Sequence, residues 1–559
     1  MAVVSKNSVT PIESRRLNYP DRSGRRIVAF YDRLKGRPRK SFMVLLLPKY
    51  GETKKNNLQL AYTMAANGLH VLRFDHTCHV GESDGAMTDF TLAGAVDDIL
   101  VTLDYIESEF GINKIVLVSS SLSSRPAIRA AALDRRIRRL VCLVGVFNLR
   151  FTLNEVYRED LVADHIGGKT WGIADILGHE IDFDNFLREA VRADMHDLSG
   201  TVSDLKKTPV PVVYFGAEND PWVDRGDVNL ALDGRKDSEV YLLEGAMHEV
   251  RENQAKGAKV YNDIVRSCFL VGRSRSRLVR PDKKGMFRQN KIERDLLRKA
   301  KEKEFEPETD FWSAYLEKYS LLDRVQDYRD YIELVGGLLG SIGDGDIVLD
   351  AGCGNGLFGV WMIRDILSRN GIQHSEPPLY VGLDLTRKGL HDAMTKHLGM
   401  QSPGVPGHYP RFIYGCMDLD EFSKPDNEGE LVVRFEENTF DKICCSLLLS
   451  YLKEPGRLLE KLYRILKPNG TLVISSMKPF CDMSMIYRDF MDQRVSSGEL
   501  EMGRDLLRAA GRIKLKEELG YYVFLSGEEM SDMANRSGFR DVQFRESFGG
   551  QAHVVRAEK

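Results

Sequence analysis

The sequence has little of what marks a secreted, disulfide-stapled or membrane protein. Cysteine is scarce, with eight residues in 559 and no paired C-x-x-C motifs, which argues against a disulfide framework and a structural zinc site. The longest apolar runs, such as Met43–Leu47 and Ile115–Val118, have strand length, whereas a membrane-spanning helix needs about 20 apolar residues. The first residues, MAVVSKNSVTPIESRR, lack the apolar core of a secretory signal. We therefore expect a reduced, cytoplasmic protein without a membrane span.

An excess of charge of one sign is also missing. Lysine and arginine number 79 and aspartate and glutamate 82, so the formal net charge is −3. This balance gives no support to a surface that coats nucleic acid, because such surfaces are strongly basic. Hydrophobic residues make up 43% of the chain, as in globular proteins, but 559 residues exceed the roughly 250–300 that one core can serve. Two domains are expected, and three are possible.

One stretch departs from the overall charge balance. Residues 273–303 contain thirteen Lys or Arg against four Asp or Glu, and their few apolar residues are scattered. We predict domains at residues 1–272 and 310–559, joined by a basic linker or helix at 273–309. The basic stretch has two interpretations, a solvated linker or a docking patch for an acidic partner such as a carrier protein.

Elsewhere, strand-like apolar runs alternate with helix-like segments, which predicts an α/β protein with mainly parallel sheets. In the first half, the run KIVLVS ends at Ser119 and SSLSS then leads into the helix-like RPAIRAAAL. A serine between small residues on a strand-to-helix turn is typical of a nucleophile elbow, usually G-x-S-x-G. Here serine replaces both glycines, and Ser121 would be the nucleophile.

Two further residues follow in the order typical of α/β-hydrolases. Asp220 follows the strand-like run Val210–Phe215, and His248 follows the run Glu239–Leu243. The order along the chain is therefore Ser…Asp…His. His248 would accept the proton of Ser121, and Asp220 would orient His248. Backbone N–H groups of Leu122 and of Lys49 or Tyr50 would stabilise an oxyanion.

The first half also resembles a known family. The segment NGLHVLRFDHTCHVGESDG, then DFT, and the glycine-poor elbow SSLSSRPA resemble the acyl-transferase of bacterial bioluminescence operons, over roughly residues 15–270. The resemblance implies an α/β-hydrolase with a lid, acting as a serine thioesterase or acyltransferase that takes fatty acyl groups from acyl carrier protein. Ser121, Asp220 and His248 match its triad.

Two further features of this half are a lid segment and a group of possible metal ligands. Residues 148–208 would form the lid, but no family motif aligns there. Its aromatic residues would either line an acyl tunnel or simply pack the lid; they are Phe151, Trp171, Phe183 and Phe186. Asp75, His76 and His79 are expected to belong to a structural loop, because no third ligand at metal spacing accompanies them. No metal is expected.

The second half contains a glycine loop. The strand-like DIVLDA ends with Asp350 and Ala351, and Gly352, Gly354 and Gly356 follow before a helix-like segment. This D-x-G-x-G-x-G pattern resembles motif I of class I S-adenosylmethionine-dependent methyltransferases, which implies a Rossmann-like domain over residues 310–559.

The resemblance assigns further cofactor contacts to the ends of the next strands. Asp384, followed by Leu385, would bind both ribose hydroxyls; Met417 and Asp418 would contact the adenine; and Ser446 would lie near the methionine end. A long insertion, residues 478–525, would fold over the methyl acceptor. Acceptor contact and plain packing are both open for Tyr487, Arg488, Tyr521 and Tyr522.

Together these features predict a bifunctional enzyme of fatty-acyl or polyketide-like metabolism. It would release or transfer an acyl group from acyl carrier protein or another acyl thioester, and methylate the product or a related small molecule with S-adenosyl-L-methionine. The alternative is a methyltransferase whose hydrolase-like domain is an inert binding module.

Overall fold

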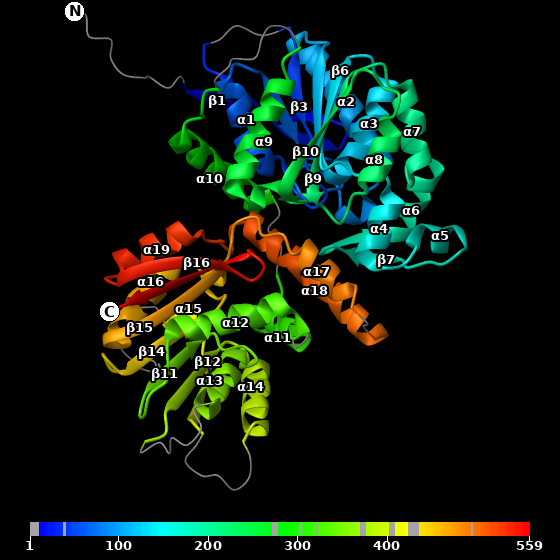
Figure 1. The fold of residues 1–559 in the computed structure, drawn as a ribbon. Coiled ribbons are helices and arrows are strands. Elements are labelled where there is room, and N and C mark those ends of the chain that lie inside the picture. The colour runs from blue at the N-terminus through cyan, green and yellow to red at the C-terminus, as the bar shows by residue number, and fades with distance from the viewer. Residues whose placement is uncertain are drawn as a thin grey trace, which may run out of the picture. The chain divides into compact units, whose positions relative to one another are not determined.

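The computed structural model describes residues 11–36, 41–270, 278–300, 305–319, 322, 324–368, 376–401, 409–422, 435–493 and 496–559. The chain forms two compact units, Met1–Lys303 with Ala510–Leu515, and Glu304–Ala509 with Lys516–Lys559 (Figure 1). Parts of the predicted basic linker, 271–277 and 301–304, lie outside the described residues. No helix in the described ranges is both long and apolar enough to span a membrane.

The first unit is built on an eight-stranded mixed sheet in the order β1-β2-β4-β3-β5-β6-β9-β10. Its strands are β1 (Ile12–Pro20), β2 (Arg26–Leu34), β3 (Met43–Leu46), β4 (Val71–Phe74), β5 (Ile115–Ser120), β6 (Ile137–Leu143), β9 (Val212–Asn219) and β10 (Ser238–Met247). β2 is antiparallel to both of its neighbours, and the strands from β4 to β10 run parallel. This order and its single reversed strand are those of the α/β-hydrolase fold.

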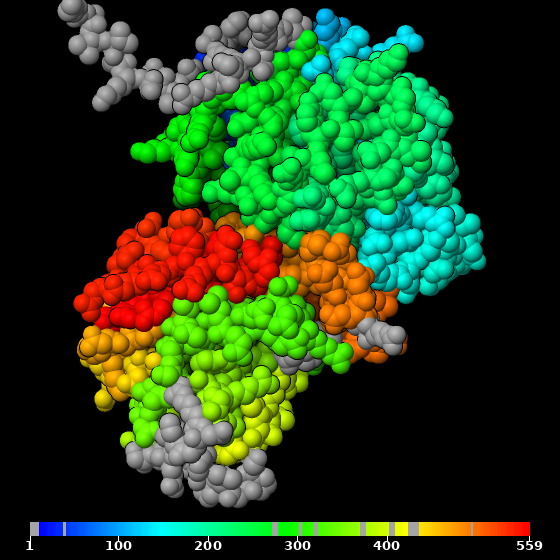
Figure 2. Space-filling model, viewed as in Figure 1, coloured from blue at the N-terminus to red at the C-terminus, as the bar shows by residue number. Residues whose placement is uncertain are grey.

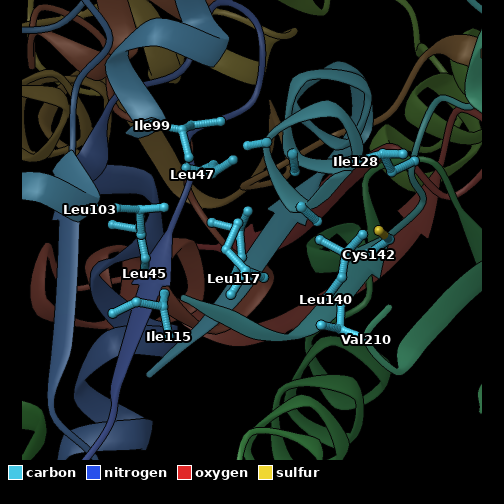
Figure 3. Packing of buried hydrophobic residues seen from close by; sticks show 14 of the residues in the cluster. Leu45, Leu47, Ile99, Leu103, Ile115, Leu117, Ile128, Leu140, Cys142 and Val210 are labelled. Atoms are coloured by element: carbon cyan, nitrogen blue, oxygen red, sulfur yellow. The ribbon is translucent and has the colours of Figure 1, made fainter. Parts of the chain in front are cut away.

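Alternation along the strands divides the core between the two faces of this sheet. Leu45 and Leu117 point into one cluster (Figure 3). Val44 and Val116 point into the other, because successive side chains leave a strand on opposite faces. The first cluster is covered by α2 (Leu92–Phe110), α3 (Ser124–Leu133), α7 (Leu198–Lys207) and α8 (Arg225–Leu232). The second is covered by α1 (Leu58–Ala66) and α9 (Gln254–Ser267). The inner parallel strands are therefore buried on both sides, whereas the edge strand β10 is largely exposed.

The predicted lid lies between β6 and β9. It contains two short helices, a two-stranded hairpin and a third helix before α7. These are α4 (Leu149–Tyr157), α5 (Leu161–Ile166), β7 (Ile173–Ile176), β8 (His179–Asp182) and α6 (Phe183–Arg192). Short 3-10 turns complete the unit, η1 (Lys54–Asn57), η2 (Met87–Asp89), η3 (Ser121–Ser123) and η4 (Val250–Glu252).

Part of the predicted basic linker forms the helix α10 (Lys283–Ala300), which packs on the first unit beside α1 (Figure 1). Arg73, in β4, is fully buried and donates to both carboxylate oxygens of Glu293 of α10, each at 2.6 Å. Asp32, on β2, accepts from the same guanidinium at 2.7 Å. A buried cation thus holds α10 to the sheet through a bidentate bond.

We expect Glu293→Gln to lower the free energy of unfolding of the first unit by about 2 kcal/mol, because an NH₂ donor replaces one of the two oxygens that accept from Arg73, and a charge-assisted hydrogen bond is lost. The measurement is denaturant unfolding monitored by tryptophan fluorescence. Asp295→Asn is the matched control: Asp295 lies on the same helix, 3.5 Å from Arg298 with both side chains about half exposed, and should change stability by less than about 0.5 kcal/mol. Equal effects of the two substitutions would contradict the buried pair.

The second unit holds a seven-stranded sheet in the order β13-β12-β11-β14-β15-β17-β16. Its strands are β11 (Ile347–Ala351), β12 (Leu379–Asp384), β13 (Arg411–Cys416), β14 (Phe440–Cys445), β15 (Leu466–Met477), β16 (Arg540–Ser547) and β17 (Ala552–Glu558). Only β17 runs antiparallel to its neighbours. The chain order reverses beside β11, so the carboxyl ends of β11 and β14 flank the crevice where open α/β sheets bind ligands.

Helices surround this second sheet, which has the Rossmann-like arrangement of a methyltransferase domain. They are α11 (Glu308–Tyr319), α12 (Gln326–Leu339), α13 (Leu357–Ser368), α14 (Arg387–Gly399), α15 (Leu419–Phe422), η6 (Leu449–Tyr451), α16 (Pro455–Ile465), α17 (Ser484–Met491), α18 (Ser497–Glu518) and α19 (Gly527–Arg536). The predicted insertion at 478–525 contains α17 and α18.

Candidate active sites

The candidate nucleophile sits on a strained turn between β5 and α3. Ser121 has a φ of +55°, in the left-handed region that a residue with a Cβ rarely adopts. The carbonyl of Ser121 accepts a hydrogen bond from Val146 N at 3.0 Å, which helps to hold this conformation. Ser123, in the position of the second usual glycine, accepts from Ser120 N at 3.0 Å and donates to Ser120 O at 2.8 Å. Serine therefore stabilises the elbow through hydrogen bonds that glycine lacks.

The structure brings the three predicted triad residues together. Ser121 Oγ lies 2.9 Å from His248 Nε2, and His248 Nδ1 lies 2.8 Å from Asp220 Oδ2. The side chains of His248 and Asp220 are only 14% and 3% exposed. Because the Asp220 carboxylate accepts from Nδ1–H, the neutral ring leaves Nε2 as an acceptor for the Ser121 hydroxyl. This arrangement can activate a serine for attack on an acyl group.

The residues predicted to supply oxyanion N–H groups follow neighbouring strands. β3 and β5 pair in parallel with Leu46 opposite Val118, so Lys49 and Ser121 each come three residues beyond this pair. Leu122 follows Ser121 in η3 and is half-buried. The two parallel strands therefore deliver Lys49 and Leu122 to the same edge of the sheet.

The Lys49 side chain is tied to the segment that carries His248. Its ammonium group lies 3.0 Å from a carboxylate oxygen of Glu249. Burial disfavours the ionised form of Glu249, but Arg251 and Lys49 outweigh it and hold the pKa of that carboxyl well below its usual range. This charge cluster was not predicted from the sequence, although Glu249 and Arg251 stand beside His248 in the chain.

Asp75, His76 and His79 lie in a buried loop with separate partners. Asp75 accepts hydrogen bonds from Lys54 N at 2.6 Å and Glu82 N at 2.7 Å, and pairs with the Lys54 ammonium. His76 lies 3.2 Å from Asp98, and His79 accepts from Gly51 N at 3.2 Å. Asp75 therefore orders the loop that follows Lys49.

Aromatic side chains run from the lid towards that loop. Phe183 and Phe186 of α6 are 1% and 3% exposed, and their ring centroids lie 6.2 Å apart. Phe186 stacks on Phe90 at 6.3 Å, and Phe90 lies 5.8 Å from Tyr50. Trp171 contacts Phe183 at 5.5 Å, whereas Phe151 is half-buried on α4. This row of aromatic rings packs the lid, and it can also form a wall of an acyl-binding site.

In the second unit, the glycine loop is held by the residue predicted to bind ribose. Gly354 N donates to one oxygen of the Asp384 carboxylate at 2.8 Å, and Thr386 donates to the other through N at 2.8 Å and Oγ1 at 2.7 Å. Gly352 and Gly356 have φ values of +79° and +83°, in the region that favours glycine. Asp384 thus joins the ends of β11 and β12 at the crevice.

Asp350, at the end of β11, is buried behind this loop. Its carboxylate is 1% exposed and accepts a hydrogen bond from the Tyr380 hydroxyl at 2.7 Å. Burial raises the pKa of Asp350 to about 7; the bond from Tyr380 opposes this and the nearby charge of Asp384 adds to it. Asp350 therefore changes its charge near neutral pH.

We expect Asp350 to make the stability of the second unit fall as the pH rises. Its pKa in the folded protein is above the value of 3.8 for the unperturbed group, so its contribution is complete below that value and is lost as the pH rises through about 7. Relative to Asp350→Asn, the free energy of unfolding of the unchanged protein should fall by about 1 kcal/mol between pH 6 and pH 8. Guanidinium titrations of both proteins at the two pH values measure this, and an unchanged difference would contradict it.

A buried histidine of α14 contacts the backbone of the glycine loop. His397 of α14 lies 2.7 Å from Gly356 O through Nε2 and 2.7 Å from the Tyr414 hydroxyl through Nδ1. Burial lowers the pKa of His397, which favours a neutral ring with its hydrogen on Nε2. No motif in the sequence indicates this contact, because His397 follows the loop by 41 residues.

The other predicted cofactor residues lie at the ends of β12, β13 and β14. Met417 N donates to Asp384 O at 2.8 Å, whereas Asp418 is exposed and accepts from Asp420 N at 2.9 Å. Leu385 O faces the thiol of Cys416 at 3.5 Å. Ser446 hydrogen-bonds the hydroxyl of Tyr331, a fully buried residue of α12.

The four residues of the insertion for which methyl-acceptor contact and packing were both open differ in exposure. Tyr487 and Tyr522 are 8% and 2% exposed, and Tyr521 is 38% exposed. The Tyr522 hydroxyl donates to Glu308 at 2.5 Å, and the buried Lys516 ammonium pairs with the same carboxylate at 2.8 Å. Arg488 lies 3.2 Å from Asp489. Tyr522 therefore ties the insertion to α11.

Comparison with known proteins gives two family matches. A model described as acyl transferase matches residues 38–282, and one described as methyltransferase domain matches residues 322–543. An acyl transferase of Photobacterium phosphoreum is 30% identical over 224 residues, 38% of this chain and 69% of that protein. One from Aliivibrio fischeri strain MJ11 is 27% identical over 236 residues, 42% of this chain and 76% of that protein. A solved putative hydrolase from Agrobacterium vitis S4 is 20% identical, covering 46% of this chain and 100% of its own, with a TM-score of 0.36.

Proposed function

Because the chain belongs to the acyl transferase family and carries a methyltransferase domain after it, we propose that it is a bifunctional enzyme. The first unit releases or transfers an acyl group from a thioester on acyl carrier protein. The second unit transfers a methyl group from S-adenosyl-L-methionine to the acyl product or a related small molecule. Membership of the acyl transferase family supports the choice of an acyl donor, and the carrier thioester is the donor that the sequence resemblance implies.

The observation that carries the first activity is the continuous hydrogen-bonded row of Ser121, His248 and Asp220, with contacts of 2.9 and 2.8 Å. His248 Nε2 takes the proton of Ser121 Oγ as the oxygen attacks the thioester carbonyl carbon. The C–S bond then breaks, and the leaving thiolate receives the proton from His248. Water or another acceptor repeats the sequence on the acyl-serine, which regenerates Ser121.

Oxyanion stabilisation in this unit is assigned to the N–H groups of Leu122 and of Lys49. Their support is the parallel pairing of β3 with β5, because Lys49 and Leu122 then follow strands that end at the same edge of the sheet as Ser121. Preformed backbone donors of this kind stabilise the negative charge that develops on the carbonyl oxygen. The ion pair of Lys49 with Glu249 would keep the loop in place as His248 gains and loses a proton.

The second unit fits S-adenosyl-L-methionine. A Cβ added to Gly352 would come within 3.0 Å of Leu448, so this loop leaves backbone rather than side chains at the end of β11. Asp384, 9% exposed at the next strand end, would bind the ribose hydroxyls, and Met417 and Asp418 would flank the adenine. When bound, the cofactor supplies an electrophilic methyl group on a sulfonium. Gly354, Gly356 and Asp350 would shape its pocket, Leu385 would line it, and Ser446 would lie near its methionine end.

The test supplies the full-length protein with acyl-carrier thioesters of several chain lengths and methyl-labelled S-adenosyl-L-methionine, followed by mass spectrometry of the products. We expect loss of the acyl group from the carrier and incorporation of label into an acyl product. Methyl transfer without acyl release would leave the first unit as an inert binding module. Acyl release with neither label transfer nor cofactor binding would refute the second activity.

A further inference from the structure

The helix α10 has one face on the first unit and one face in solvent. Its buried residues are Gln289, Glu293 and Leu297, spaced by four, so they form one stripe along the helix. Figure 2 shows the green segment that includes α10 at the surface of its unit. The opposite face of the helix is exposed to solvent.

The outer face of α10 is basic and carries two exposed apolar side chains. The helix carries seven Lys or Arg and two acidic residues, and Glu293 is neutralised by the buried Arg73. Phe287 is 73% exposed and Ile292 is 45% exposed. The outer face comprises Lys283, Lys284, Phe287, Arg288, Lys291, Ile292, Arg298 and Lys299, all exposed. Among the described residues, Lys284, Arg288 and Lys291 form no ion pair with another side chain. Their exposed positive charges can therefore face carboxylates of a partner.

The direction of α10 is set by two contacts at opposite ends of α1. Asn67, just beyond the end of α1, binds the backbone of Val279 through two hydrogen bonds of 2.8 and 2.9 Å, ahead of α10. Glu293 binds Arg73, which also donates to the carbonyl of Lys54 at 3.0 Å, just before α1 begins. Because Lys54 follows the Lys49 segment, α10 runs towards the edge of the sheet that carries Ser121. Its 18 residues span about 27 Å.

We propose that the outer face of α10 docks the acidic surface of the acyl carrier protein, with Phe287 in a shallow apolar contact and the surrounding cations facing carboxylates; this rests on the proposed function. An exposed aromatic side chain among unneutralised cations suits a transient protein interface that is steered by charge. An anionic membrane fits less well, because an interfacial helix needs a continuous apolar face and the inner face of α10 is already bound to Arg73. α10 lies beyond the residues matched by the acyl transferase model, so the surface is a feature of this chain.

The test compares the unchanged protein with the variant Lys284→Glu/Arg288→Glu/Lys291→Glu and, separately, with Phe287→Ala. Two acyl donors are used, an acyl-carrier thioester and the same acyl group on free pantetheine. The control reverses three exposed cations elsewhere in the unit, Lys206→Glu/Lys207→Glu/Lys236→Glu. We expect the α10 triple variant to lower kcat/KM for the carrier thioester tenfold to a hundredfold, roughly 1.4–2.7 kcal/mol, and to leave pantetheine turnover unchanged. Added salt should reproduce part of this loss in the unchanged protein only.

Direct binding separates a failure of this surface from a failure of the proposed function. Calorimetry with the acyl-carrier protein should give a Kd that the α10 variant weakens and the control does not, whether or not the acyl group turns over. Equal carrier affinity in the unchanged and α10 variant proteins would overturn the docking surface while leaving the thioesterase intact. Binding to phosphatidylglycerol vesicles that the α10 variant alone loses, with carrier affinity unchanged, would likewise overturn it in favour of a membrane surface.

Discussion

Replacing Ser121 by alanine is expected to lower acyl release from a carrier thioester by at least about a thousand-fold. The hydroxyl 2.9 Å from His248 Nε2 is the only part of the side chain removed, and without it no acyl-serine can form. Loss of a nucleophile that acts as one unit with its base costs about as much as loss of the whole triad. Residual release would come from His248 acting on water beside the N–H groups of Leu122 and Lys49. Steady-state release of free acid, measured by mass spectrometry, gives the ratio.

Ser123→Ala is the matched control for this substitution. Ser123 lies on the same turn, and its hydroxyl bonds only the backbone of Ser120 among the contacts described. We expect its removal to cost about 1 kcal/mol of stability and less than tenfold in release. A serine-directed fluorophosphonate should label the unchanged protein and Ser123→Ala but not Ser121→Ala. Undiminished release by Ser121→Ala would refute the nucleophile assignment and favour the inert module.

The triad geometry was predictable because chain order and strand ends carry the information. Parallel strands place their carboxyl ends at one edge, so residues following β5, β9 and β10 must converge. The serine-rich elbow was also readable as a turn, although its supporting bonds were not, since Ser120 and Ser123 pair only once the turn has formed. The α/β class of both halves followed from the alternation of strands and helices, and the two specific folds followed from the resemblances of their motifs.

Contacts between distant residues were not predictable, because no local pattern marks them. Arg73 and Glu293 are 220 positions apart, and neither stands in a motif that links them. The charge of the basic stretch is evident from the sequence, but no local pattern distinguishes Glu293 from the other acidic residues there. His397 and Tyr331 likewise act through partners on other elements, beneath the glycine loop and behind Ser446. Arg73, His397 and Tyr331 contact these partners only after folding has buried them together.

The second large effect concerns the cofactor. We expect Asp384→Asn to weaken binding of S-adenosyl-L-methionine by about a thousand-fold and to leave acyl release unchanged. The carboxylate accepts from Gly354 N through one oxygen and from Thr386 through the other. An asparagine has one acceptor and one NH₂ donor at these positions, so a donor must face either Gly354 N–H or Thr386 N–H. The substitution thus removes the charge that would bind ribose, and it also displaces the glycine loop. Two charge-assisted hydrogen bonds to Asp384 are lost, and together they are worth about 3–6 kcal/mol.

Two controls separate charge from loop position and from surface charge. Thr386→Val removes only the 2.7 Å bond from Oγ1 to Asp384 and that from Gly389 N at 3.1 Å, so cofactor affinity should fall tenfold or less. Asp392→Asn, on α14 and paired with Lys388, should leave affinity unchanged. Calorimetry with S-adenosyl-L-homocysteine measures all three without a methyl acceptor. If Asp384→Asn and Asp392→Asn bind equally well, the ribose contact does not lie at the end of β12. If Thr386→Val loses as much affinity as Asp384→Asn, the position of the loop, rather than the charge of Asp384, controls binding.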